Sequence, residues 1–420
     1  MMDDLVARFG TPLYVYRLAE VRAAARDLRA ALPEETRLYY SLKANPHPAV
    51  VAELVRCGLF CEVSSSGELW SALAAGQAAQ RCLFTGPAKT AAELDDALDR
   101  GVRTFSVESE VDHRRLATAV RSRGVPVDYL VRINTLRAAG RGTGLRMTGV
   151  ATQFGTSPEA AVELIRDGRD GGLLNPVGVH LFPATNVPDQ DDLLAEFELS
   201  LRTTAELLSA TGIAGRLVSI GGGFAAPFAR PGARPSYLGL GTKLSEVLDA
   251  TLPGWRQGRP RVAFESGRFL VGTSGTLLTT VLDVKTSGKT THVILDAGVN
   301  ALGGMSGLGR TLPQVQPSPA PDPSGGGELQ RVTLVGTLCT PLDLLSRSAE
   351  IRIPVVGDVL RIPNVGAYGL SASLLAFLSK PVPAEVVVDE DGSVVGARRI
   401  ELRERELTSW AGVAERAIDE

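Results

Sequence analysis

Charged side chains stand at the ends of several apolar runs, where β-strands are expected to finish. Lys43 follows the run RLYYSL, Glu62 lies within LFCEVS, and Glu265 and Arg268 flank a Ser-Gly pair in FESGRF. A lysine at the end of an apolar strand is costly unless it is paired or used chemically, and Glu62 could pair with it. Plainer explanations stay open, because Lys43 could be a solvated loop residue. Glu265 and Arg268 could likewise form a surface pair, which stabilises a fold only slightly.

Two further motifs would act through backbone groups. SIGGGF places Gly221, Gly222 and Gly223 directly after an apolar run. Such glycines let backbone N–H groups approach an anion closely, although they could equally form a tight turn. CEVSSSGEL has the residue types of a helix N-cap, with Glu68 in the first turn of the helix that would follow.

The runs that end in these residues alternate with alanine-rich or charged segments of helical periodicity. Alternating strands and helices predict a parallel sheet in an α/β fold. Eight such strands favour a closed (β/α)8 barrel over an open doubly wound sheet, and a barrel of this kind has its chemistry at the C-terminal strand ends. The expected strands are 37–42, 59–64, 81–86, 103–108, 128–133, 176–182, 216–221 and 261–266.

Beyond residue 267 the sequence is rich in β-like runs, with one helix-like segment, SASLLAFLS, among them. The run PLYVYR near the start could join the same domain. We therefore expect a barrel over residues 25–267 and a β-rich domain made of residues 1–24 and 268–420. The stretch QPSPAPDPSGGG at 316–327 has the composition of an exposed loop.

Composition excludes several classes of protein. The 420 residues carry a net charge of −3 with 44% hydrophobic residues, which is ordinary for a globular protein and gives no basic surplus for nucleic acid. No apolar run is long enough to span a bilayer, and the acidic start MMDDLVARFG does not resemble a secretory signal. The four cysteines lack zinc-ligand spacing, so we expect no metal site, no disulfide framework and a cytoplasmic location.

Taken together, the motifs resemble the fold type III pyridoxal phosphate (PLP) dependent decarboxylases, the diaminopimelate/ornithine decarboxylase family. The resemblance covers nearly the whole chain, in the same order. The family fold is an alanine-racemase-like (β/α)8 barrel followed by a C-terminal β-rich, Greek-key-like barrel domain. The matching motifs are SLKAN, EVSSSGEL, VRIN, GGGF, ESGRFLVG, LDAGVN, GTLC with a later Asp343, and GDVLRIPNVGAYG.

The resemblance implies roles for individual residues. Lys43 would hold the cofactor as a Schiff base, and Glu265 would pair with its ring nitrogen. Cys339 resembles the residue that returns a proton after carbon dioxide leaves, and in this family it acts in the partner subunit's site, within a head-to-tail homodimer. The implied cofactor-binding residues are Glu62, His180, Phe182, Thr185, Gly221, Gly222, Gly223, Glu265, Gly267, Arg268 and Tyr368.

One departure from the family pattern lies beside the cofactor. The family's histidine that stacks on the PLP ring aligns with Phe182, in the segment GVHLFPATN, and His180 lies two residues earlier on the same strand face. Phe182 can still stack but offers no protonatable edge. Thr185 aligns with the family's phosphate-binding serine and keeps a hydroxyl. An aromatic residue at this position resembles a branch that acts on modified, conjugated or carrier-bound amino acids.

Two other departures concern the distal part of the substrate. The acid that follows the cysteine in diaminopimelate decarboxylases is Thr340 here, although Asp343 is kept as a candidate amine contact. The family's substrate-carboxylate arginine is replaced by a glycine-rich stretch at 303–309, after which Arg310 could substitute. Diaminopimelate is therefore disfavoured as the substrate.

The sequence thus predicts PLP-dependent decarboxylation of an amino acid, or of a modified or conjugated amino acid, in specialised metabolism rather than lysine biosynthesis. The substrate-contact residues would be Thr340, Asp343 and Arg310. Two alternatives stay open on the same scaffold, namely an amino-acid racemase or epimerase and a noncatalytic PLP-binding protein. The segment GTLC…D favours decarboxylation, because alanine racemases share the fold but lack that segment.

Overall fold

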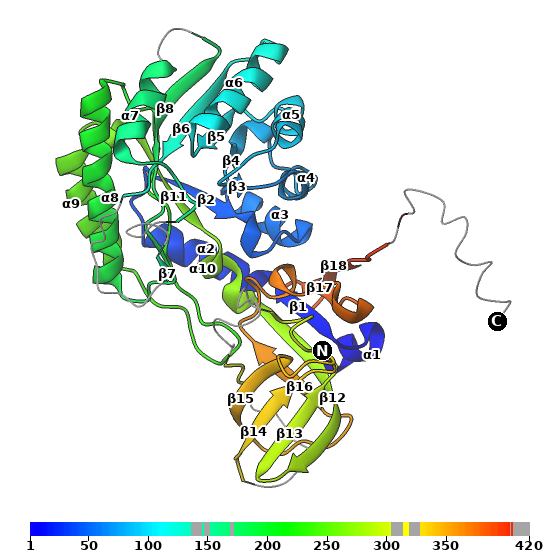
Figure 1. Cartoon of the computed structure of the whole chain (residues 1–420). Coiled ribbons are helices and arrows are strands. Elements are labelled where there is room, and N and C mark those ends of the chain that lie inside the picture. Colours follow the sequence, from blue (N-terminus) through cyan, green and yellow to red (C-terminus); the bar gives the residue numbers. More distant parts are fainter. Residues whose placement is uncertain are drawn as a thin grey trace, which may run out of the picture.

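The computed structural model describes residues 1–135, 145–146, 152–168, 172–303, 314–318, 328–403 and 405. A helix-covered barrel forms one end of the molecule, and a β-rich domain extends from its lower side (Figure 1). The largest apolar core runs through the barrel wall and its helices and continues into the β-rich domain.

Eight parallel strands close the barrel, so the predicted (β/α)8 architecture is confirmed. Each of the eight expected runs forms one strand, and the last pairs back onto the first through residues such as Glu265 and Tyr39. The strands are β2 (Arg37–Ser41), β3 (Phe60–Val63), β4 (Cys82–Phe84), β5 (Thr104–Val107), β6 (Val127–Arg132), β8 (Leu174–His180), β10 (Leu217–Ser219) and β11 (Arg261–Ser266).

Helices cover the outside of the barrel, and polar caps begin several of them. Ser65, Thr90, Ser109, Ser157 and Asp189 each accept a backbone N–H in the first turn of the helix that follows, which satisfies donors that the helix leaves free. The N-cap expected in CEVSSSGEL is thereby confirmed. The helices are α2 (Leu18–Ala30), α3 (Pro48–Arg56), α4 (Ser66–Ala74), α5 (Ala91–Asp99), α6 (Glu110–Arg123), α7 (Pro158–Asp167), α8 (Gln190–Thr211) and α9 (Leu240–Thr251).

The β-rich second domain is confirmed as one sheet built around a long strand, β12 (Gly275–Ser287). The N-terminal run joins it as β1 (Leu13–Arg17), between β12 and β17 (Ala384–Val388). Because β12 also pairs with β13 and β16, the described strands form a branched sheet. The remaining strands are β13 (Thr290–Leu295), β14 (Gln330–Val335), β15 (Leu344–Ile351), β16 (Val359–Pro363) and β18 (Val394–Arg399).

Short elements complete the chain. In the described part of the chain they are α1 (Met2–Phe9), the ribbon of β7 (Leu145–Arg146) and β9 (Ala184–Thr185), α10 (Arg268–Val271) and six short 3₁₀ turns. The expected domain boundaries at residues 25 and 267 stay a prediction, and residue 25 lies within α2.

The helix predicted from SASLLAFLS does not form. Two 3₁₀ turns, η5 (Leu370–Ala372) and η6 (Phe377–Ser379), take its place. Leu378 and Ser379 have φ angles of 55° and 49°, which no right-handed helix contains. Leu378 and Phe377 stay exposed, so the apolar periodicity of this segment does not bury it within the chain.

Candidate active site

Lys43 lies in the 3₁₀ turn η1 (Leu42–Ala44) that follows the first barrel strand. Its Nζ is 3.2 Å from Glu62 Oε2 and 5.6 Å from the centre of the Phe182 ring. The side chain of Lys43 is 42% exposed, whereas that of Glu62 is 2% exposed. The expected Lys43–Glu62 pair is therefore present in this structure, and the amine can still be reached from outside the barrel.

Neighbouring loops fix the position of Lys43. A side chain at Gly267 would place its Cβ 2.7 Å from the Cβ of Ala44, so only glycine fits beside this turn. From the β-rich domain, the Tyr368 N–H donates to the Ala44 carbonyl over 2.8 Å, and Asn45 Nδ2 donates to the Gly366 carbonyl over 3.0 Å. Both domains thus hold the lysine-bearing turn.

The charge of Lys43 depends on the carboxylates around it. Burial opposes the charged form, but Glu62, followed by Tyr368 and Glu265, raises the pKa of Lys43 above its usual range. Glu62 is itself held by the hydroxyls of Thr85 and Ser64. The lysine is therefore held as an ammonium group at the rim of the barrel.

Glu265 lies near the C-terminal end of β11. It belongs to a group of four side chains, with Ser106, His180 and Ser219, that are each at most 1% exposed. Ser219 Oγ donates to its Oε1 over 2.5 Å, and His180 Nε2 lies 3.1 Å from the same oxygen. Burial raises the pKa of Glu265, but the interaction with neighbouring His180 outweighs it, and Lys43 and Ser219 add to the lowering. Among the described residues, Oε2 of Glu265 has no hydrogen-bond donor, so one oxygen of an ionised carboxylate is left available.

The glycine triplet and Arg268 form the candidate anion site. Gly221 and Gly223 have φ angles of 74° and 115°, and a Cβ at Gly222 would lie 2.0 Å from the Glu265 carbonyl oxygen. Close packing therefore requires these glycines whether or not an anion binds. The Arg268 guanidinium lies over the Tyr368 ring at 4.8 Å, and its buried Nε has no hydrogen-bond partner among the described residues.

These residues fit PLP. The ring nitrogen needs a carboxylate oxygen, which Glu265 has available, and the phosphate needs donors, which Arg268 and the glycine backbone can supply. Phe182 lies beside Lys43 as an aromatic surface. Thr185 lies in β9, which follows the barrel strand β8, and β10 and β11 separate β8 from β2 in the barrel. Burial alone lowers the pKa of Arg268, so an anion would relieve an unfavourable position.

The predicted residues of the β-rich domain divide into exposed and buried ones. Cys339 is exposed on the turn between β14 and β15, and its thiol makes no hydrogen bond to a described residue. Thr340 orders that turn, since its hydroxyl accepts from Leu342 N. Asp343 is 3% exposed, and its two oxygens accept from Val299 N and Leu338 N over 2.8 Å and 2.7 Å.

Asp343 therefore has a structural task. Side chains at Gly298 and Gly336 would overlap its carboxylate, so the surrounding backbone is packed tightly against it. A contact between Asp343 and a substrate amine stays a prediction, and the engagement of both its oxygens speaks against it. Arg310 lies outside the described residues.

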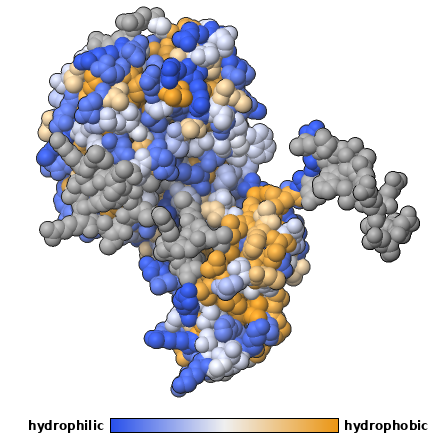
Figure 2. All heavy atoms as spheres, viewed as in Figure 1, coloured by the Kyte–Doolittle hydropathy of each residue, from blue (hydrophilic) through white to orange (hydrophobic). Residues whose placement is uncertain are grey.

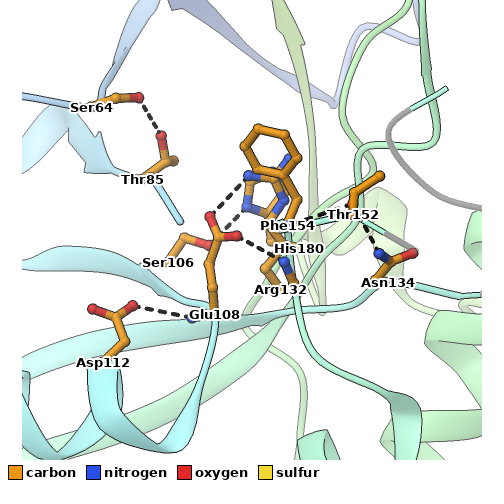
Figure 3. A network of polar contacts seen from close by, with 12 residues as sticks. Ser64, Thr85, Ser106, Glu108, Asp112, Arg132, Asn134, Thr152, Phe154 and His180 are labelled. Atoms are coloured by element: carbon orange, nitrogen blue, oxygen red, sulfur yellow. Dashed lines mark hydrogen bonds and ion pairs between the residues drawn. The ribbon is translucent and has the colours of Figure 1, made fainter. Parts of the chain in front are cut away.

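Sequence reasoning missed the polar residues that support the site. Arg132 Nη1 donates to Glu108 Oε1 over 2.9 Å, Phe154 lies 4.8 Å from the guanidinium, and Gly155 N donates to Glu108 (Figure 3). Ser106 and Ser219 were also missed. A signal was available, because each of these two serines interrupts an otherwise apolar barrel strand and is fully buried there.

The described residues contain neither a helix that could span a membrane nor a side-chain cluster that could hold a metal ion. No helix among them has the length and apolar character needed to cross a membrane. In the same part of the chain, no cluster of His, Cys, Asp and Glu could hold a metal ion.

Comparison with known proteins agrees with this geometry. Residues 18–272 match the family model for the pyridoxal-binding domain of pyridoxal-dependent decarboxylases. The chain is 30% identical to the L-glutamyl-[BtrI acyl-carrier protein] decarboxylase of Niallia circulans, over 91% of this chain and 90% of that protein. It is 31% identical to the diaminopimelate decarboxylase of Methanothermobacter thermautotrophicus, over 92% and 89%.

A solved structure shares the whole architecture. The diaminopimelate decarboxylase of Helicobacter pylori, complexed with L-lysine, superposes with a TM-score of 0.81 at 25% identity, covering 96% of this chain and 97% of that one. The chain therefore belongs to the pyridoxal-dependent decarboxylase family. It is a PLP-dependent amino-acid decarboxylase, as its sequence predicted.

Proposed function

We propose that Lys43 holds PLP covalently and that the site decarboxylates a conjugated amino acid, such as one carried on a carrier protein, in specialised metabolism. The main support for this proposal is the position of the Lys43 ammonium, which lies 3.2 Å from buried Glu62 at the open end of the barrel. Glu265, with one oxygen available, receives the ring nitrogen. Arg268, Tyr368 and the Gly221–Gly223 backbone receive the phosphate.

Each residue then has a physical task. PLP, when bound, supplies the electron sink that stabilises charge left as carbon dioxide departs. Glu265 keeps the ring nitrogen protonated, and Arg268 anchors the phosphate so that the reacting bond keeps one orientation. Glu62 accepts a hydrogen bond from Lys43 Nζ and holds its proton near the reacting carbon. Phe182, whose ring centre lies 5.6 Å from Lys43 Nζ, would shield the bound ring from water without offering a competing proton.

Cys339 completes this site from the second subunit of a head-to-tail homodimer. Its exposure, and the absence of a described partner for its thiol, support a task outside its own chain. Figure 2 shows hydrophobic side chains gathered on the upper part of the β-rich domain. Leu342, Leu374, Phe377 and Leu378 are exposed apolar residues of that domain, as expected of a surface that a partner covers.

Mixed dimers test this arrangement directly. Lys43→Ala and Cys339→Ala are each expected to abolish most turnover. Co-expression should restore roughly a quarter of wild-type turnover, because half of the dimers are mixed and each of these has one intact site. No restoration, with mixed dimers verified by differently tagged chains, would contradict a site shared between subunits.

The substrate proposal depends on what surrounds the reacting centre. Thr340 stands where diaminopimelate decarboxylases have an acid, so one contact for a distal amine is missing. The similarity to a decarboxylase that acts on a glutamyl-carrier protein supports a conjugated substrate here. Free diaminopimelate has two charged ends, and a site without a partner for the distal amine loses affinity for it.

The deciding experiment measures carbon dioxide release by the purified, PLP-loaded protein. The substrates are free L-amino acids, meso-diaminopimelate and amino acids joined to a carrier protein as thioesters through a side-chain carboxyl, so that the α-carboxylate stays free, with glutamyl first. We expect turnover on a thioester and little on diaminopimelate. Efficient turnover of free diaminopimelate, with none on thioesters, would contradict the proposed substrate class. Exchange of the Cα hydrogen without release of carbon dioxide would favour a racemase.

A further inference from the structure

Behind the candidate ring-nitrogen contact lies a chain of four buried polar side chains from four barrel strands. Ser106 Oγ lies 2.8 Å from His180 Nδ1, and His180 Nε2 lies 3.1 Å from Glu265 Oε1. Ser219 Oγ donates to the same carboxylate oxygen over 2.5 Å. Figure 3 shows His180 beside Ser106, within the polar network at the barrel's inner face.

The direction of these contacts follows from their chemistry. An ionised carboxylate only accepts hydrogen bonds, so the hydrogen of a neutral His180 must be on Nε2. Nδ1 is then an acceptor, and the Ser106 hydroxyl must donate to it. Although the order Ser–His–Glu resembles a hydrolytic triad, Ser106 is 0% exposed and no substrate can reach its hydroxyl. The chain therefore points toward Glu265 and not toward a nucleophile.

The contact between His180 and Glu265 is close but lacks the alignment of a full hydrogen bond. His180 thus acts on the carboxylate largely through the polarity of its N–H and through steric restraint. Because Oε1 is occupied by His180 and Ser219, Oε2 is the oxygen left for a ligand. The ammonium of Lys43 also favours the ionised form of Glu265.

We propose that His180, with its tautomer fixed by Ser106, is a positioning residue that keeps Glu265 ionised and turned toward the cofactor's ring nitrogen. This inference rests on the proposed role of Glu265.

The first test needs no cofactor. In the apoprotein labelled with ¹⁵N-histidine, the His180 signals are identified by their loss in His180→Asn. The Nε2–H tautomer is expected, and in Ser106→Ala a mixture of tautomers should replace it. An Nδ1–H tautomer in the wild type would overturn the proposed chain of contacts.

The second test uses PLP with ¹⁵N in its ring. In the wild type the ring nitrogen should give a protonated signal, and in His180→Leu the signal should shift toward that of neutral pyridine, with turnover reduced roughly tenfold. His180→Gln, which keeps an N–H donor, should restore most of the signal and decides the matter if the leucine variant does not fold. His292→Asn, in the β-rich domain, is the matched control and should match the wild type.

The attachment of PLP to Lys43 and the role of His180 can be tested separately. If borohydride reduction of the wild type leaves no PLP on Lys43, the proposed function is wrong. If PLP is attached and its ring nitrogen stays protonated in both His180→Leu and Ser106→Ala, only the role of His180 is overturned.

Discussion

Two lysines of the barrel rim each pair with a carboxylate, yet their surroundings differ sharply. Lys43 is 42% exposed and contacts one carboxylate, that of Glu62. Lys89 is 1% exposed, and its ammonium donates to the Gly86 and Ser106 carbonyls and to Asp112. All three protons of Lys89 are used, whereas Lys43 has donors left and an open approach.

The difference separates a structural lysine from a reactive one. A buried ammonium with three acceptors stabilises the packing of β4, β5 and α6, and chemistry there would require breaking the fold. The exposed Lys43 can be reached by a carbonyl carbon, and its carboxylate partner is an acceptor for the proton that the ammonium must lose before it reacts. Residue type alone did not distinguish the two, because both lysines follow apolar strands.

The largest expected effect is that of Lys43→Ala. Turnover should fall on the order of 10³-fold or more, because the covalent anchor and a proton carrier are both lost. The visible absorbance of bound PLP should disappear. Absorbance spectra and carbon dioxide assays measure this, and a variant that keeps its absorbance and half its turnover would remove Lys43 from the mechanism.

Lys89→Met should instead act on stability. The variant leaves Asp112 buried without its partner, which costs about 3–5 kcal/mol of unfolding free energy. Lys43→Met should cost less, about 1 kcal/mol, because the Lys43 side chain is 42% exposed and Glu62 keeps hydrogen bonds from Thr85 and Ser64. Urea unfolding curves measure both losses of unfolding free energy. Equal losses in the two variants would show that Lys43 contributes as much to stability as Lys89. The double variant Lys89→Met with Asp112→Leu should recover part of the loss.

Cys339→Ala should reduce turnover about 10²-fold and leave the PLP spectrum intact, because a thiol that returns a proton is not needed to bind the cofactor. Cys57→Ala is the matched control, since Cys57 is also an exposed free cysteine. An unchanged rate and product in Cys339→Ala would show that Cys339 takes no part in the reaction.

The smallest effect concerns Glu68, whose pKa depends on burial and on the charges of Glu62 and Lys43. Burial, and then the charge of Glu62, raise the pKa of Glu68 to about 7. The folded protein therefore binds more protons than the unfolded chain between the usual glutamate pKa and pH 7, so stability falls as the pH rises through this window.

Glu68→Gln should flatten that pH dependence. On going from pH 5 to pH 8 the variant should lose less unfolding free energy than the wild type, by on the order of 1–2 kcal/mol. The exposed Glu246→Gln serves as the control. Parallel pH profiles for wild type and Glu68→Gln would contradict the raised pKa of Glu68.

Periodicity predicted all eight barrel strands, because a barrel strand buried on both faces is a short apolar run whatever lies around it. The same reasoning failed for SASLLAFLS. Its periodic apolar residues fit a helix, but the turn that carries Tyr368 bonds to the Lys43 loop and forces the chain into two short turns. Local propensity was overridden by a tertiary contact.

For the site, the sequence by itself determined which strand ends carry charged groups, and hence Lys43, Glu62, Glu265 and Arg268, because the ends of parallel strands meet at one rim. It could not determine that Asp343 is enclosed by backbone donors, that Lys89 is buried with three acceptors, or that His180, held by Ser106, and Ser219 meet at one carboxylate. Those facts depend on strands distant in the chain, and only the closed barrel brings their inward faces within hydrogen-bond distance.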